Sequence, residues 1–300
     1  MKVLLAGAFG NLGSDILRTL CKTDNEIIAA DAISRPIDGL DESRYTTKKI
    51  DVTNSESLKG LCDGVDVVIT TVGLTKASAK FSNYDIDFHG NLNLLNEAKS
   101  AGVKHFNYIS VIGADQGDGV PMVNSKYLME RELVKSGVSY VIYRPTGYFY
   151  DIAKVFMPMV EKGEVQLLKH KPEPRCNIVD TIDFAEFIVK SMCDDNKLYN
   201  VGGKETYTYR EVAEMFFRAN GKEPVIKTVP PFLMSVLANL PKIKKEGRRD
   251  VILFGKFTMT HDCVGDTMIG EKSFREYIES KEYVAKYEAV KAAAAAAAAK

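Results

Sequence analysis

Seven residues near the start of the chain, 7–13, carry three glycines at a spacing that suits the phosphates of a dinucleotide. They follow an apolar run, residues 3–6, and lead into residues 12–21, whose apolar side chains recur on one helical face. Gly7 can make a tight turn, Gly10 can let the backbone approach a pyrophosphate, and Gly13 can let the helix pack closely on the strand. A ligand-free glycine turn is the alternative, but the strand–turn–helix context favours a nucleotide. The predicted cofactor-binding residues here are Gly7, Phe9, Gly10, Asn11, Leu12 and Gly13.

An acid at the end of the next predicted strand, residues 27–31, indicates which dinucleotide is bound. Asp31 lies roughly 20 residues beyond the glycines, where a carboxylate accepts hydrogen bonds from the adenosine ribose. The same charge would repel the 2′-phosphate of NADP. Arg35, four residues further on, could instead bind that phosphate. The sequence therefore favours NAD, with NADP as the alternative; a solvated turn is the other interpretation of Asp31.

Composition is ordinary for a globular chain and excludes several classes of function. The 300 residues are 45% hydrophobic and 27% charged, and 40 basic residues balance 40 acidic ones, so nothing indicates nucleic-acid binding. The five cysteines show neither close pairing nor metal-ligand spacing, and we expect buried thiols in a reducing compartment and no metal site. A strand is predicted directly after Met1 and no apolar run could cross a bilayer, so we expect a cytoplasmic protein.

Strands and helices are predicted to alternate through the first half of the chain, which favours an α/β fold with a doubly wound parallel sheet, the Rossmann fold. Residues 1–150 would form this dinucleotide-binding domain, and residues 151–290 a small, mainly helical C-terminal substrate cap with elements that return to the main sheet. The low-complexity tail, 291–300, is left aside. The strands are predicted at 3–6, 27–31, 45–50, 65–71, 105–110, 140–143, 165–168 and 198–201, and the helices at 12–21, 55–61, 83–100, 125–136, 183–192, 209–220 and 232–240.

Several further motifs, spread over about residues 1–285, resemble the short-chain dehydrogenase/reductase superfamily in its extended or atypical branch. This branch includes NmrA-like proteins, isoflavone-reductase-like enzymes and divinyl-chlorophyllide reductases. The motifs are Asp51-Val52, Thr70-Thr71-Val72-Gly73, residues 105–110, Arg144-Pro145 and residues 199–203. The resemblance implies that Asp51 and Val52 contact the adenine, that Thr71 and Val72 run beside the cofactor, and that Ser110 is the active-site serine.

The resemblance also places Lys126 at the family's catalytic lysine, near the nicotinamide ribose, and exposes one departure. Family dehydrogenases carry a tyrosine four residues before this lysine, and here that position is Met122, which has no proton to give. Tyr127 points about 100° away on a helix, and Tyr148 or Tyr150 could supply a proton instead. The alternatives without a catalytic role are that Lys126 is a surface lysine at a helix start and that Ser110 only forms a turn.

Three functions remain open at this point. The first is an atypical NAD(P)-dependent reductase or epimerase-like enzyme acting on a small organic substrate, with Lys126 and Ser110 as catalytic residues. The second is a non-catalytic redox sensor that binds the dinucleotide, and the third a structural subunit of a larger assembly. The basic cluster at 242–249 follows an apolar segment and could face a membrane or an anionic substrate, although a solvated loop is the simpler interpretation.

Overall fold

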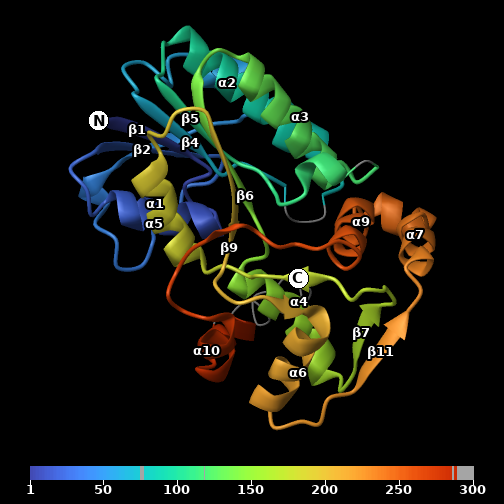
Figure 1. The fold of residues 1–300 in the computed structure, drawn as a ribbon. Helices are drawn as coiled ribbons and strands as arrows, with labels where there is room; N and C mark the ends of the chain where they lie inside the picture. The colour runs from blue at the N-terminus through green and yellow to red at the C-terminus, as the bar shows by residue number, and fades with distance from the viewer. Residues whose placement is uncertain (75–77, 118, 286, 289–300) are drawn as a thin grey trace, which may run out of the picture.

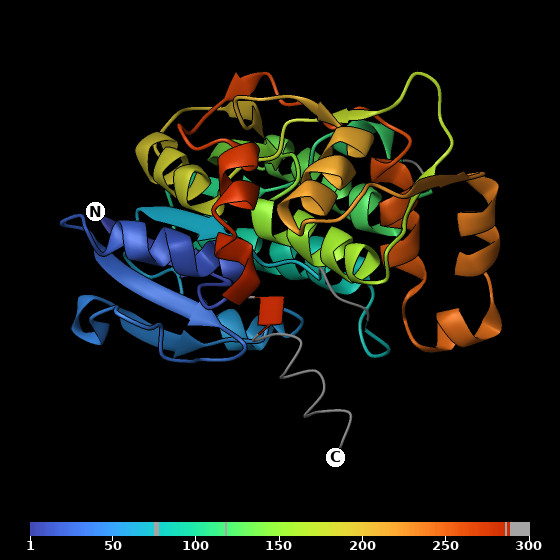
Figure 2. The same ribbon diagram turned by 90° about the horizontal axis from the view of Figure 1, so that it is seen from below.

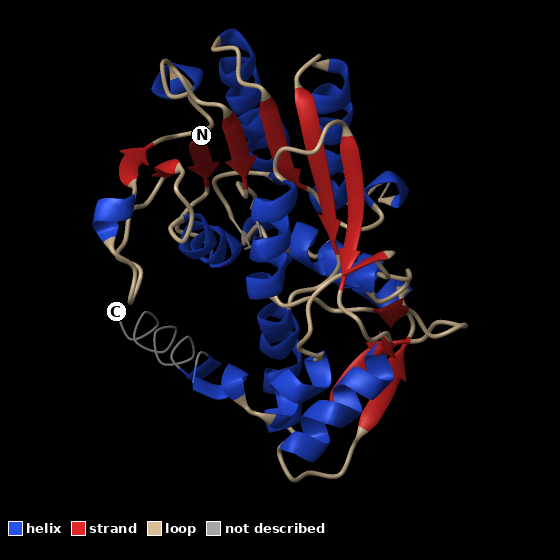
Figure 3. Ribbon diagram, turned by 60° about the vertical axis from the view of Figure 1, so that its left-hand side comes forward, coloured by secondary structure: helices blue, strands red, loops and turns tan. Residues whose placement is uncertain are grey.

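A computed structural model describes residues 1–74, 78–117, 119–285 and 287–288 and contains an eight-stranded, entirely parallel sheet (Figures 1 and 3). The strand order is β3-β2-β1-β4-β5-β6-β9-β12, so the chain leaves β1 in one direction and, after β3, crosses back to β4 on its other side. The predicted doubly wound Rossmann sheet is confirmed. Its strands are β1 (Lys2–Ala6), β2 (Glu26–Asp31), β3 (Thr46–Lys49), β4 (Val67–Thr70), β5 (His105–Ile109), β6 (Ser139–Pro145), β9 (Lys197–Gly202) and β12 (Thr267–Met268).

Alternating side chains of the strands build one apolar core on each face of the sheet. In β1, Val3 and Leu5 point to the face covered by α1 (Asn11–Leu20) and α5 (Thr181–Ser191). Leu4 and Ala6 point to the opposite face, covered by α2 (Asn91–Ser100) and α3 (Pro121–Lys135). Burial on both faces explains why β1 and β4 are continuous apolar runs in the sequence.

A second body of the chain lies beyond the carboxyl ends of the strands and has its own aromatic core (Figure 1). It combines helices with two small two-stranded sheets, one antiparallel and one parallel. Stacked rings such as Phe156 and Phe216, 5.7 Å apart, fill its centre. Its elements are α4 (Phe149–Glu161), β7 (Val165–Leu168), β8 (Arg175–Cys176), β10 (Tyr207–Thr208), α6 (Tyr209–Ala219), β11 (Ile226–Val229) and α10 (Phe274–Glu279).

Three helices lie between β11 and β12 along the chain: α7 (Phe232–Ala238), α8 (Pro241–Lys245) and α9 (Arg249–Thr258). α7 packs on α9, and α9 packs on α3 of the main sheet. Figure 2 shows α7 and α8, in orange, set apart at one end of the molecule. None of the described helices is long and apolar enough to span a membrane.

The structure differs from the sequence-based prediction at several points. The helix predicted at 183–192 is α5, which packs on α1 of the main sheet rather than in the cap. The strand predicted at 198–201 is β9 of the main sheet, in line with the expected return of elements from the second half of the chain. The expected loop at 242–249 is largely helical, because Pro241 begins α8. α3 begins at Pro121, four residues before the predicted start, and the predicted helix at 83–100 begins with a π-helical turn, Tyr84–Gly90.

The prediction of buried thiols holds for three of the five cysteines. Cys62, Cys176 and Cys263 are buried, whereas Cys21 is half-buried and Cys193 is exposed, so the prediction is wrong for Cys193. The tail set aside at 291–300 lies outside the described residues.

Candidate functional site

The glycine turn between β1 and α1 is held tightly at two of its three glycines. Gly7 has a positive φ of 78°, and a Cβ there would lie 2.5 Å from the Thr71 hydroxyl oxygen. A Cβ on Gly13 would lie 2.0 Å from the carbonyl oxygen of Gly7. A Cβ on Gly10, by contrast, would meet its nearest atom at 3.4 Å, and Gly10 is exposed. Gly7 and Gly13 are therefore required by the fold itself, whereas Gly10 leaves its space to something outside the fold.

The first turn of α1 leaves backbone donors available beside Gly10. Gly10 is the N-cap residue, and no described side chain caps the helix there. The first amides of an α-helix have no partner within it, and the helix dipole adds partial positive charge at the same end. Asn11 is exposed at this end, while Leu12 is buried against the sheet. The turn therefore fits the diphosphate of a dinucleotide, since it offers donors, positive potential and room.

Asp31 and Arg35 both bind the backbone of one residue of this turn, Phe9. The Asp31 carboxylate accepts hydrogen bonds from the amides of Phe9 (3.0 Å) and Ala32 (2.7 Å). The Arg35 guanidinium donates to the carbonyl of Phe9 at 2.7 Å. The acid and the base that would decide between NAD and NADP thus lie on either side of Phe9. Asp31 also fastens the turn to the end of β2.

The segments at the ends of β3 and β4 place the other predicted cofactor residues. The Thr71 hydroxyl donates to the carbonyl of Gly7 at 2.9 Å, which joins Thr71 to the glycine turn. The carbonyl of Val72 accepts a hydrogen bond from the Asn91 amide (3.1 Å). Asp51 is exposed and accepts hydrogen bonds from the hydroxyl and amide of Thr53, which hold the pKa of Asp51 below its usual range.

Val52, the neighbour of Asp51, is buried against the start of α2. A Cβ on Gly90 would lie 2.7 Å from Val52 Cγ2, so glycine lets the helix approach this side chain. The carbonyl of Val52 accepts a hydrogen bond from Asn93 at 2.9 Å. Val52 is 8% exposed and lies in the core between the sheet and α2.

Lys126 projects from α3 into a largely buried network whose acid the sequence analysis did not single out. Its ammonium group lies 3.1 Å from Asp87 Oδ1 and donates to the carbonyl of Ile109 at 3.1 Å. Asp87 is 1% exposed, and its other oxygen accepts hydrogen bonds from the Leu74 amide and the Asn83 side chain, each at 3.0 Å. Lys126 is thus a largely enclosed, ion-paired lysine, its side chain 13% exposed, rather than the surface lysine of the alternative interpretation.

The segment that follows β4 passes directly over this ion pair. A Cβ on Gly73 would lie 2.9 Å from Asp87 Oδ1 and 3.3 Å from the ammonium nitrogen of Lys126. Glycine at position 73 thus lets the backbone pass close to Asp87 Oδ1, a buried oxygen that pairs with Lys126 and accepts no hydrogen bond. Because Thr71 touches the glycine turn and Gly73 touches Lys126, this short segment connects the two parts of the predicted site.

Ser110 is buried next to this network and is bound to a second acid, Glu130. The Ser110 hydroxyl donates to the Glu130 carboxylate, which is 3% exposed. Arg144 binds the same carboxylate with two nitrogens, at 2.9 and 2.6 Å, and reaches Asp115 at 3.0 Å. In this arrangement the Ser110 hydroxyl serves a structural ion pair, and its predicted contact with substrate stays a prediction.

One face of α3 carries Met122, Lys126 and Glu130 at intervals of four residues, all largely buried. Charged side chains in line with a core methionine are the sequence signal that could have identified Glu130.

The two tyrosines considered as proton donors, Tyr148 and Tyr150, are weaker acids than a free tyrosine. Burial raises the pKa of Tyr148, and burial together with the charge of Asp151 raises that of Tyr150.

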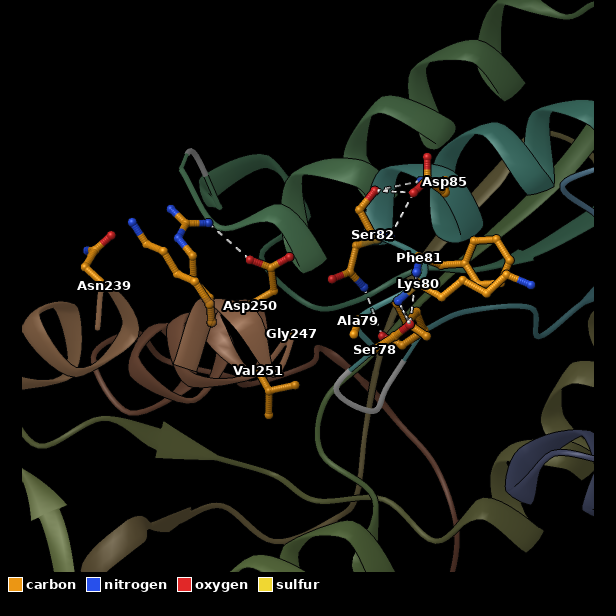
Figure 4. A pocket seen from close by; sticks show the side chains of 14 residues that line it. Ser78, Ala79, Lys80, Phe81, Ser82, Asp85, Asn239, Gly247, Asp250 and Val251 are labelled. Atoms are coloured by element: carbon orange, nitrogen blue, oxygen red, sulfur yellow. Dashed lines mark hydrogen bonds and ion pairs between the residues drawn. The ribbon is translucent and has the colours of Figure 1, made fainter. Parts of the chain in front are cut away.

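A cavity of about 660 Å³ lies beside the Lys126 network, with Leu74 and residues from 78 to 85 on one side and the α7–α9 segment on the other (Figure 4). Leu74 and Asn83 line it and also hold Asp87. Its opposite wall contains Asn239, Lys244, Arg249, Asp250 and Val251. A Cβ on Gly247 would lie 2.0 Å from the carbonyl oxygen of Ser78, so the two walls touch there.

The sequence model of the NmrA-like family matches residues 1–284. The chain belongs to the NmrA-like family. Among curated relatives, the photosystem II assembly factor Ycf39 of Cyanophora paradoxa is 24% identical over 245 residues, which cover 80% of this chain and 75% of that protein. A chloroplastic divinyl chlorophyllide a 8-vinyl-reductase of Cucumis sativus is 26% identical over 259 residues, covering 77% and 60% of the two chains. This NmrA-like chain is thus similar both to an assembly factor and to a reductase.

Solved structures share the fold of this NmrA-like chain. The NADPH complex of the quinone oxidoreductase QOR2 from Escherichia coli has a TM-score of 0.71 at 17% identity, covering 93% of this chain and 99% of that chain. The NAD complex of the UDP-glucose 4-epimerase from Thermus thermophilus has a TM-score of 0.62 at 22% identity, covering 85% and 99%. The resemblance extends over both bodies of the molecule.

Proposed function

We propose that this NmrA-like protein binds a nicotinamide dinucleotide and reduces a small organic substrate with it. The observation that carries the proposal is the uncapped start of α1 behind Gly10, the one glycine of the turn that the fold leaves room beside. The solved complexes with NADPH and NAD that share the fold support the same ligand class.

The residues of the turn would hold the dinucleotide along the carboxyl edge of the sheet. The amides at the start of α1 would bind the pyrophosphate, and Asp31 the adenosine ribose, with NAD preferred. Arg35 provides the alternative, NADP. Asp51 and Val52 would lie at the adenine, and Thr71 and Val72 beside the nicotinamide half.

Lys126 would act on the ribose of the nicotinamide half and on the substrate. When bound, the cofactor supplies the hydride. The Lys126 ammonium donates to Ile109 and pairs with Asp87, which fixes its position and leaves a proton to bind a ribose hydroxyl. Its positive charge would stabilise negative charge developing on a substrate in the cavity beside Leu74 and Asn83. Ser110 would assist only if its hydroxyl turned from Glu130 to a substrate carbonyl.

The two bodies of the chain would divide this work. Residues 1–150 would bind the dinucleotide, and residues 151–290 would supply the cap that encloses the substrate, apart from the elements that return to the main sheet. The cytoplasm is the compartment that the cysteine content favours, and the chloroplastic relatives suggest an organelle as the alternative.

A second candidate is a non-catalytic protein that binds the dinucleotide and assists assembly or senses redox state. Met122 favours it, because the position four residues before Lys126 is a buried thioether instead of a phenol. The similarity to the Ycf39 assembly factors supports the same alternative.

Calorimetric titration with NADH and NADPH, followed by absorbance assays with enones and quinones, tests the proposal. We expect Lys126→Met to weaken dinucleotide binding about tenfold, as one lost charged hydrogen bond would, and to abolish turnover. Lys135→Met, an exposed lysine of the same helix, is the control and should leave both unchanged. Binding without turnover across the substrates would favour the second candidate, and absence of dinucleotide binding would overturn both.

A further inference from the structure

The apolar residues of α7 and the turn after it form an exposed surface on the part of the chain that the structure describes. We call this surface the α7 face: Phe232, Leu233, Val236, Leu237 and Leu240, all between 39 and 61% exposed. The last four of these residues lie one, four, five and eight positions after Phe232, which places all five on one side of a helix. Five of the fourteen large hydrophobic side chains exposed in the described chain lie within these nine residues, so they form a patch rather than scattered exceptions.

The opposite side of α7 explains why this face stays uncovered. α7 rests on α9 through its other side, where Ala238 is fully buried and the Ser235 hydroxyl accepts a hydrogen bond from Lys256. Ile243 of α8 is buried as well. The packing on α9 therefore fixes the orientation of α7, and its apolar face points outward.

Basic side chains border the α7 face. Residues 242–249 contain five lysines and arginines and one acid, Glu246, which pairs with Arg248. Lys242 and Lys245 are exposed and have no partner among the described residues. An apolar helix face beside unpaired cations matches the headgroup boundary of an anionic bilayer, where apolar side chains enter the acyl region and cations meet the headgroups.

The shape of the region distinguishes a bilayer from a folded protein partner. Figure 2 shows α7 and α8 projecting from one end of the body. A bilayer accepts a projecting apolar face without a complementary groove. We propose that the α7 face docks this protein reversibly on the surface of an anionic lipid bilayer, with Lys242 and Lys245 in contact with the headgroups.

Flotation of the full chain with vesicles tests the proposal. We expect binding to vesicles that contain phosphatidylglycerol, little binding to phosphatidylcholine alone, and release at about 0.5 M NaCl, where the charges are screened. Phe232→Ser/Val236→Ser and Lys242→Glu/Lys245→Glu should each reduce binding at least about tenfold. Val155→Ser/Ile182→Ser removes two comparably exposed side chains, on α4 and α5, and should leave binding unchanged.

The loss of vesicle binding must be distinguished from a loss of folding or of dinucleotide binding. Thermal melting and NADH titration should be equal for Phe232→Ser/Val236→Ser and the native chain, because none of these side chains lines the cavity or the glycine turn. Absence of native binding to the anionic vesicles would overturn the proposal, and so would equal losses in the α4/α5 control. A dimer in sedimentation that Phe232→Ser/Val236→Ser dissociates would assign the face to a second copy instead.

Discussion

The two halves of the candidate site are held by different means. At the glycine turn, backbone groups from one short stretch make the site, and side chains such as Asp31 fasten it from a neighbouring strand. Around Lys126, side chains from distant segments make the site, with acids at Asp87 and Glu130 buried beneath it. A site of the first kind can be predicted from the spacing of residues that are close in the sequence. A site of the second kind forms only when the chain folds and brings distant residues together.

The largest difference between the halves should appear in stability, through the buried acid of the side-chain network. Glu130→Ala removes the bidentate partner of Arg144 and leaves that guanidinium largely buried, so we expect a loss of about 3 kcal/mol in the free energy of unfolding. Glu132→Ala breaks an exposed pair with Lys135 on the same helix and should cost about 0.5 kcal/mol or less. Urea unfolding measures the free energy of unfolding of both variants. Equal losses would contradict the view that the Glu130–Arg144 pair stabilises the fold.

The glycine turn itself should divide into structural and ligand-facing positions. Gly13→Ala places a methyl group against the Gly7 carbonyl and should destabilise the fold by about 2 kcal/mol. Gly10→Val should leave the melting temperature nearly unchanged and weaken dinucleotide binding at least about tenfold, because the side chain enters the space of the pyrophosphate. Unchanged affinity of the Gly10 variant in calorimetry would remove the dinucleotide from this turn.

The smallest effect concerns the choice between the two dinucleotides. Asp31→Asn retains an acceptor for the Phe9 amide but removes the charge, so the preference for NADH over NADPH should narrow about tenfold, or 1.4 kcal/mol. Asp41→Asn, an acid that caps a turn further along, is the control. Tighter binding of NADPH by the native chain, abolished in Arg35→Ala, would show that Arg35 decides the preference.

The sequence was sufficient for the fold and for the position of the glycine turn because both follow from local patterns. The apolar runs and glycines at 7–13 predicted the sheet and the turn, and Asp31 lies at the carboxyl end of β2 as expected. Asp87 could not be predicted as the partner of Lys126, since 39 residues separate them and the pairing depends on how α3 packs on the preceding segment. The prediction of a loop at 242–249 was wrong because it relied on the high charge of the segment and overlooked Pro241 as the first residue of a helix.

The π-helical turn at Tyr84–Gly90 has a consequence for insertions and deletions. It carries Asp87 directly before the regular helix α2, and such a turn accommodates more residues than an α-helical one. Deleting one residue between Asp87 and α2 would rotate Asp87 by about 100° relative to α2, away from Lys126. The counter-ion of this lysine is therefore set by the length of the segment as much as by the residue type, and a one-residue deletion there separates the ion pair while every side chain of the site is retained.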